Sequence, residues 1–291
     1  MTKFYRQATL RIKLINGSKD GYVNTLNISG LRVSFSIQKS LAFTTNSAVI
    51  KIWNLSQSNR NLIKDYGDEV TLFAGYELEG GPQVLFIGDT TAVSHIFEQP
   101  EIVTILECGD GEKYLNQLRV SVSYTSESPA RTIISDIARQ MGIDLVEYAA
   151  SPNLVYRQGF KFIGMGKDAL TLVCDKLGLQ WSVQNNGLQV IPLNGSIGAV
   201  AVEVNQNTGM QGIPQRYTYK SLDLFRAITA PNTGYKVNVA LNPLIIPGTR
   251  IILSSSHLNF KGPYRVDNIR HEGDTFGFIW SSQIQCTEIP Q

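Results

Sequence analysis

Cysteine and histidine are both scarce in this 291-residue chain. The three cysteines, Cys108, Cys174 and Cys286, are odd in number and widely separated, so their spacing builds neither a disulfide framework nor a zinc motif. We expect buried free thiols. The three histidines, His95, His257 and His271, are not within helical reach of one another, and no His-Glu-x-x-His element occurs. The sequence therefore predicts no metal site.

An excess of charge of one sign and a long hydrophobic run are also missing. The chain has 26 basic and 24 acidic residues, which gives a net charge of +2 and no basic stripe for duplex binding. No segment approaches the roughly 18 apolar residues of a membrane span, and no apolar run follows the first charged residues. We therefore expect a protein made in a cytosol, without a membrane span and without specific nucleic-acid binding.

Nucleotide-binding and nucleophile motifs are lacking as well. Gly159 and Gly164 have the separation of a phosphate loop, but Met165 stands where the lysine must be, and no Ser or Thr follows Lys167. We interpret this glycine pair as a turn into a helix. No Gly-x-Ser-x-Gly elbow occurs.

Three carboxylates, Asp89, Glu107 and Asp110, are candidates for catalysis. They could supply the carboxylate pair of glycoside cleavage, which uses an acid and a base or nucleophile on opposite sides of one bond. However, Gly88-Asp89 and Gly109-Asp110-Gly111 are typical of turns at strand ends. We favour the turns, and predict no enzyme activity, no catalytic residues and no cofactor.

The chain is rich in strand patterns. Leu31, Val33, Phe35 and Ile37 alternate with polar residues, the period of a half-buried strand. In the first part of the chain we predict strands over 8–15, 28–38, 48–54, 70–77, 83–97 and 101–108. A short helix capped by Ser56 or Ser58 is predicted within 56–65, lying across a barrel mouth.

The pattern changes after residue 118. Ser128 as N-cap and Pro129 as first helical residue predict a helix that ends near Gly142. A second helix is predicted over 166–176, followed by a hairpin turning at Asn185-Asn186-Gly187, because Asn and Gly tolerate the positive φ of such turns.

Strands return in the last third, where we predict them over 198–204, 226–230, 237–241, 250–254, 262–270 and 276–286. Residues 192–219, rich in Gly, Asn and Gln, indicate a connection with a long loop over 206–215. That loop is either a solvent loop or a contact for a partner.

The two β-regions share an order of features. Residues 86–108 and 264–286 both have the order strand, histidine, turn, strand, cysteine, which indicates either an internal duplication or a chance likeness. The predicted fold is mainly β (α+β), with two β-barrel-like domains, 1–118 and 194–291, and a small α/β domain, 119–193, between them. Each region holds one tryptophan, Trp53, Trp181 or Trp280. We interpret them as core residues, with a sugar-binding platform as the alternative and Trp53 as the residue to test for exposure.

The order of elements resembles the baseplate hub proteins of contractile-tailed bacteriophages. The resemblance rests on Ile50-Lys51-Ile52-Trp53-Asn54-Leu55-Ser56, Leu72-Phe73-Ala74-Gly75-Tyr76 and Val84-Leu85-Phe86-Ile87-Gly88-Asp89, then Leu177-Gly178-Leu179-Gln180-Trp181 and the segment 262–280. It implies two similar β-barrels per chain, so that a homotrimer presents six similar barrels to a hexameric tail tube and threefold symmetry to a trimeric spike.

The resemblance also implies a structural protein of the virion, assembled in the host bacterial cytoplasm, with the tail tube protein, the spike protein and other baseplate proteins as partners. Because the chain stops at Gln291 after the last β-region, we expect any cell-wall hydrolase to be a separate protein. Two alternatives stay open: a carbohydrate-binding or glycan-hydrolysing multi-domain β-protein, and the hub of a flexible-tailed phage or of a phage-derived injection machine.

Overall fold

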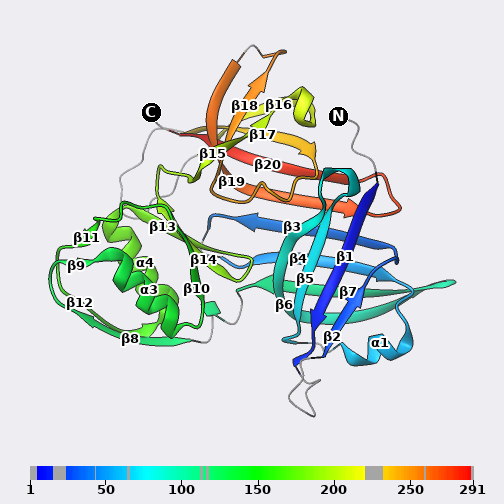
Figure 1. The fold of residues 1–291 in the computed structure, drawn as a ribbon, viewed down its shortest axis with the longest axis horizontal. Coiled ribbons are helices and arrows are strands. Elements are labelled where there is room, and N and C mark those ends of the chain that lie inside the picture. Colours follow the sequence, from blue (N-terminus) through cyan, green and yellow to red (C-terminus); the bar gives the residue numbers. More distant parts are fainter. Residues whose placement is uncertain are drawn as a thin grey trace.

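The computed structural model describes residues 5–15, 24–42, 44–63, 66–111, 114–115, 118–219, 232–258 and 260–289. Its dominant feature is a 13-stranded sheet, accompanied by one three-stranded and two two-stranded sheets (Figure 1). The mainly β class is therefore confirmed. The strand predicted over 226–230 lies outside the described residues.

Seven strands make up the first β-region: β1 (Arg6–Lys13), β2 (Thr25–Ile28), β3 (Val33–Ser40), β4 (Asn46–Trp53), β5 (Glu69–Tyr76), β6 (Gly81–Glu98) and β7 (Glu101–Asp110). The strand predicted over 28–38 was wrong in extent, because Gly30 turns the chain at φ 74° between β2 and β3. The short helix is α1 (Gln57–Leu62), and Ser56 caps it by accepting from Asn59 N at 3.3 Å. A 3-10 turn, η2 (Glu77–Glu79), follows β5.

The α/β insert contains two helices, α3 (Ala130–Gln140) and α4 (Gly166–Leu177), and α3 ends near Gly142 as predicted. Pro129 is the N-cap of α3 and not its first residue, because Ser128 and Pro129 pair with another strand. The hairpin is confirmed, with positive φ at Asn185 and Asn186. The strands are β8 (Arg119–Tyr124), β9 (Ser128–Pro129), β10 (Asp144–Tyr148), β11 (Val155–Tyr156), β12 (Phe160–Met165), β13 (Leu179–Gln184) and β14 (Gly187–Pro192).

Six strands form the last β-region: β15 (Ile197–Val204), β16 (Met210–Tyr219), β17 (Asn232–Ala240), β18 (Thr249–Ser255), β19 (Phe260–Asp274) and β20 (Trp280–Glu288). The long loop predicted over 206–215 was wrong. This stretch holds a 3-10 turn, η3 (Gln206–Thr208), whose start is closed by a capping box of Asn205 and Thr208, and then most of β16.

Three apolar cores coincide with the three regions. The first lies inside the early strands, the second between the insert's helices and strands, and the third inside the late strands. Leu241, which follows β17, and Trp280, the first residue of β20, belong to the last β-region but pack in the first core. The two β-regions therefore share part of a core, and the exact domain limits at 118 and 193 stay a prediction.

The two β-regions also share one sheet. β3 pairs antiparallel with β19, from Ser34 opposite Asp274 to Ser40 opposite Asn268. This pairing, called here the inner joint, makes one continuous antiparallel run in the order β16-β17-β20-β19-β3-β4-β7-β6. Figure 1 shows the insert beyond one end of these strands, and the β19–β20 turn and the β6–β7 hairpin at the other end.

Candidate assembly surface

The pairing pattern of the first β-region is repeated in the last. The order β3-β4-β7-β6-β5-β1 is matched by β16-β17-β20-β19-β18-β15, strand for strand. One difference is that β1 pairs antiparallel with β5, whereas β15 pairs parallel with β18. The strand pairing therefore favours an internal duplication over a chance likeness.

The repeat holds at the level of single residues. Cys108 lies opposite Thr90, and Cys286 lies opposite Val266. In both hairpins the register shifts at the next residue of the long strand, a β-bulge at the same place. Counting onward from these bulges, His95 in β6 and His271 in β19 occupy equivalent positions.

His271 lies at the inner joint, opposite Ile37 of β3. Its Nδ1 is 2.7 Å from Ser282 Oγ, and its side chain is fully buried. Burial, with a smaller contribution from Lys39, lowers the pKa of His271 to about 3. A buried, neutral histidine therefore lies in the pairing of β3 with β19.

A buried polar cluster fixes the insert to the sheet beside this joint. It consists of Lys39, Asn46, Asp110, Gln184 and Asn185, and is called here the junction cluster. The Asp110 carboxylate accepts from the backbone N–H groups of Asn185 and of its neighbour in the turn, both at 2.7 Å, and from Asn46 Nδ2 at 3.0 Å. Lys39 Nζ donates to Asn185 Oδ1 at 2.6 Å. The hairpin turn therefore lies between a carboxylate and an ammonium group.

Further hydrogen bonds connect β13 of the insert to β4 and to the end of β3. Asn46 Nδ2 donates to Val183 O at 2.8 Å, and Gln184 Nε2 donates to Ser40 O at 2.7 Å. Burial lowers the pKa of Lys39 to about 8, against the opposing effect of Asp110. Burial likewise raises the pKa of Asp110, against the effects of Lys39 and of the donors around it.

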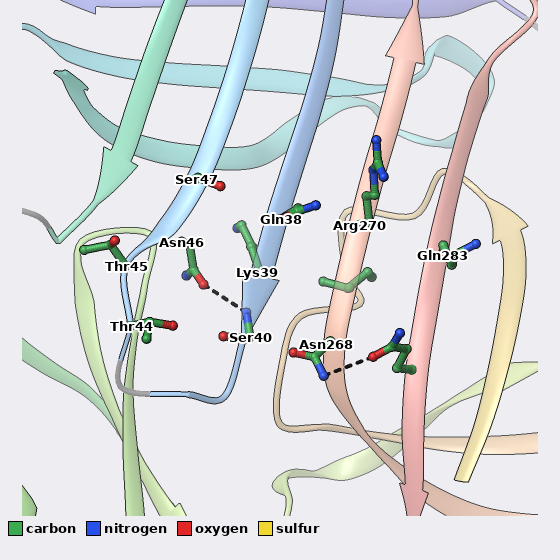
Figure 2. A pocket seen from close by; sticks show the side chains of 12 residues that line it. Gln38, Lys39, Ser40, Thr44, Thr45, Asn46, Ser47, Asn268, Arg270 and Gln283 are labelled. Carbon is green, nitrogen blue, oxygen red and sulfur yellow. Dashed lines mark hydrogen bonds between the residues drawn. The ribbon is translucent and has the colours of Figure 1, made fainter. Parts of the chain in front are cut away.

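A polar groove of about 410 Å³ lies over the inner joint. Figure 2 shows that Gln38 and Arg270, from the paired strands β3 and β19, lie on it side by side. It is otherwise lined by amides and hydroxyls, without an aromatic side chain: Ser40, Thr44, Thr45, Asn46, Ser47, Asn268, Gln283 and Gln285, together with Lys39 and Ile269. The outer side of the joint is thus polar, whereas its inner side holds buried residues that include Ile37 and His271.

The continuous run of strands ends in two open edges. On β6, residues 81–89 pair with β5, and Thr90 is hydrogen-bonded to the backbone of Gly67 and Asp68; beyond Thr90 the strand pairs only with β7 among the described residues. Nearly all of residues 91–98 are exposed. At the other end of the run, β16 pairs with β17 alone within the described part of the chain. Open edges of this kind offer unpaired N–H and C=O groups to another strand.

An apolar turn projects at the end of the strands opposite the insert. Phe276 and Phe278 are 76% and 101% exposed, although the turn is held by Phe276 N on Asp274 Oδ1 and by Asp274 N on Ile279 O, both at 3.0 Å. The strand predicted over 276–286 therefore begins only at Trp280. Phe97, at the tip of the β6–β7 hairpin, is exposed at the same end.

The residues weighed as catalytic do not form a pair. Glu107 is exposed on β7, whereas Asp89 and Asp110 are buried. Asp110 is occupied by the junction cluster. Gly88 and Asp89 lie inside β6 and not in a turn, and Gly88 is needed because a Cβ there would meet Gly109 O at 2.7 Å. The turn interpretation was wrong for this pair and right for Gly111, which has φ 79° after the end of β7.

The histidines lie on separate elements, and the described residues contain no group of three His, Cys, Asp or Glu that could hold a metal ion. Gly159 precedes β12 and Gly164 lies in it. Gly166, the first residue of α4, is the glycine that the helix needs, because a Cβ there would meet Met141 at 2.4 Å.

All three tryptophans are buried, with exposed fractions of 9% or less. The Arg32 guanidinium covers Trp53 at 4.2 Å, and Trp181 Nε1 donates to Thr171 Oγ1 at 3.1 Å. Trp280 packs edge-on against Phe35 at 5.4 Å. They therefore form no exposed platform for sugars. The three cysteines are buried free thiols, as predicted.

Comparison with known proteins identifies the fold. No protein-family model matches the sequence, and no curated protein matches it. The structure is similar to the tail protein from Neisseria meningitidis MC58 (TM-score 0.64, 10% identity, 97% of each chain covered). It is also similar to the 43 kDa tail protein of prophage MuSo2 from Shewanella oneidensis (TM-score 0.65, 10% identity, 98% of this chain and 97% of that chain).

A third similar structure comes from E. coli and is a component of the type VI secretion system, itself structurally similar to the T4 bacteriophage tail proteins gp27 and gp5. The TM-score is 0.60 at 12% identity, over 96% of this chain and 77% of that chain. The chain therefore has the fold of these tail proteins, as the resemblance implied. No helix in the described ranges is long and apolar enough to cross a membrane.

Proposed function

We propose that this protein is the central baseplate hub of a phage or phage-derived tail. In this role it is a structural protein that assembles as a homotrimer between a hexameric tail tube and a trimeric spike. It is not an enzyme in this proposal, and its place is the virion, after assembly in the host cytoplasm.

The repeated strand order carries the proposal. A trimer with two similar units per chain has six similar units around its axis and still has only threefold symmetry. Such a ring can meet sixfold and threefold partners on opposite sides. The structural similarity to phage tail proteins supports the same function.

A contractile tail is the context we favour. The similar type VI secretion component favours a second context, an injection machine with the same symmetry problem. Both contexts give the chain the same task, so the experiment below tests them together. The tryptophans do not support the carbohydrate-binding alternative, because all three are buried.

The mass of the purified chain, measured by light scattering behind a sizing column, tests this function. We expect three times the 32.2 kDa of one chain, and a ring with six similar lobes in electron micrographs. A monomer at every concentration, which also fails to associate with the tube and spike proteins of the same tail, would contradict it.

A further inference from the structure

We propose that the apolar turn, residues 275–279, is a preformed docking site for the tail tube protein, with Phe276 and Phe278 inserted into an apolar pocket of that partner. This inference rests on the proposed function and names the side chains that make the contact. The pocket that fits the turn is bordered by lysine or arginine side chains, because the surface around the turn is acidic.

The side chains of the apolar turn are exposed, although they are large and apolar. Phe276, Phe278 and Ile279 have exposed fractions of 76%, 101% and 57%. Aromatic side chains are enriched at the centres of protein–protein interfaces, and a cluster of exposed apolar side chains marks an interaction site. The turn therefore has the chemistry of a protein contact.

Two exposed side chains from the first β-region extend this apolar patch. Tyr5 and Leu78 are 69% and 70% exposed. Their segments are neighbours in space, because Tyr5 O accepts from the backbone N–H of Glu77 at 3.0 Å. Both segments lie close to the apolar turn, because Arg6, which follows Tyr5, donates to Gly277 O at 2.9 Å. The patch is therefore built from three separate parts of the chain.

Hydrogen bonds from the first β-region hold the apolar turn in place. The Arg32 guanidinium binds both oxygens of the Asp274 carboxylate, with Nη2 at 2.8 Å and Nε at 3.2 Å. Thr275 N donates to Val33 O at 3.0 Å, and Val33 N donates to Thr275 Oγ1 at 3.1 Å. A contact surface that is already ordered loses less conformational entropy when it binds. The turn is therefore prepared for docking before the partner arrives.

Acidic side chains surround the patch. Glu77 and Glu79 are exposed on η2, on either side of the exposed leucine of the patch. Glu98 and Glu101 lie at the tip of the β6–β7 hairpin and interact electrostatically with Arg32, which is already paired at the base of the turn. A partner with basic side chains around an apolar pocket would complement this surface in both charge and polarity.

The repeat of the strand order favours the sixfold partner over the threefold one. The β6–β7 hairpin corresponds to the β19–β20 hairpin, and Phe97 at its tip is 64% exposed, at the same end of the strands as the apolar turn (Figure 1). A trimer therefore has exposed aromatic side chains at six similar positions of this end. The insert, in contrast, occurs once per chain. A sixfold partner finds six similar contacts only where both repeats contribute one.

The two kinds of turn differ in size. The β6–β7 hairpin turns over Gln99 and Pro100 alone, whereas five residues with two phenylalanines connect β19 to β20. Six tube subunits would thus each meet an aromatic side chain, and every second subunit would receive the larger turn. We expect the apolar turn to carry most of the binding and Phe97 to carry less.

Substitution of both phenylalanines tests the site, with binding of the purified full chain to the tube protein of the same tail as the measurement. We expect Phe276→Ser combined with Phe278→Ser to weaken binding by about thirtyfold or more, and Phe97→Ser by about fivefold. The matched control is Ile163→Ser on β12 of the insert, where the side chain is 75% exposed. We expect this control to bind within about twofold of the unchanged chain, because such side chains outside a contact are near neutral.

The anchoring of the turn has its own variant. Asp274→Ala keeps both aromatic rings but removes the partner of Arg32 and the acceptor for Phe276 N. We expect about tenfold weaker binding, because the partner must then order the turn itself. A turn that binds only through exposed apolar area would bind equally well in this variant.

Photo-crosslinking locates the contact directly. Phe278→Cys, labelled with benzophenone maleimide, places a photoreactive group on the turn, and the native cysteines give little background because all three are buried. We expect illumination to link this residue to the tube protein and not to the spike protein. The same label at Ile163→Cys should give no link to the tube protein.

The outcomes separate the docking site from the function. A double phenylalanine variant that stays trimeric by light scattering and loses the tube protein supports the site. Equal binding of this variant and the unchanged trimer overturns the site and leaves the hub proposal standing. Loss of the trimer in this variant makes the turn a subunit contact, and loss of the spike protein makes it a spike contact; both overturn the assignment. An unchanged chain that stays monomeric and binds neither tube nor spike protein overturns both proposals.

Discussion

Asp110 holds the insert against the sheet, and Asp110→Ala tests how strongly. Its carboxylate is fully buried and accepts hydrogen bonds from two backbone N–H groups and from Asn46. Lys39, also buried, would then lack its nearest negative charge. Breaking a buried charge pair costs about 3–5 kcal/mol, and each unsatisfied buried donor costs about 1–3 kcal/mol. Because these terms overlap, we expect a loss of about 4 kcal/mol in the free energy of unfolding.

Urea denaturation followed by tryptophan fluorescence measures this loss. The control is Glu107→Ala on the same strand, an exposed position that we expect to change the free energy of unfolding by less than about 0.5 kcal/mol. The double variant Asp110→Asn with Lys39→Met should lose less than the two single variants added together, since neither charge remains. A loss below about 1 kcal/mol for Asp110→Ala would refute the cluster as the attachment of the insert.

Three further predictions follow. His271 is neutral in the folded state, with a pKa of about 3, so between pH 6.5 and 5 the unfolded state binds more protons and the free energy of unfolding should fall on acidification by up to about 1.4 kcal/mol per pH unit. His271→Asn should reduce this pH dependence, which urea titrations at several pH values measure. Trp280→Ala should lower the free energy of unfolding by about 3–5 kcal/mol in thermal unfolding because its ring is buried, whereas Phe278→Ser should change it by less than about 0.5 kcal/mol because Phe278 is fully exposed. Equal losses for the two variants would contradict the exposed position of Phe278 in the turn. Burial raises the pKa values of Cys108 and Cys286 to about 12, so a thiol reagent should label the chain only after unfolding, and rapid labelling of the native chain would contradict their burial.

Much of the fold could be predicted because its signals are local. Alternation marked β3, Gly142 marked the end of α3, and two asparagines with a glycine marked the β13–β14 turn. The turn over 275–279 could not be distinguished from a strand, since Phe276, Phe278 and Ile279 have strand-forming side chains. The hydrogen bond of Asp274 with the backbone N–H of Phe276 makes the turn, and period-two patterns carry no sign of it.

The candidate surface was less accessible to sequence reasoning. Whether an edge strand is covered by its own chain depends on long-range pairing, and β3 with β19 joins segments more than 200 residues apart. The sequence signal for this surface was the similar spacing of His95 and Cys108 in one β-region and of His271 and Cys286 in the other. Only the pairing showed that this similarity extends to the bulge and to the order of the strands. Lys39 and Asn46 were missed in the junction cluster because their partners lie in the insert.

The insert and the apolar turn lie at opposite ends of the same strands. A ring of these chains would therefore have a top and a bottom that differ in shape and in chemistry, one carrying the α/β inserts and the other exposed phenylalanines. Two such rings would not stack on each other, because the two faces that would meet differ. One ring would therefore enter an assembly once and in one orientation, and that orientation would set the polarity of the rest of the assembly.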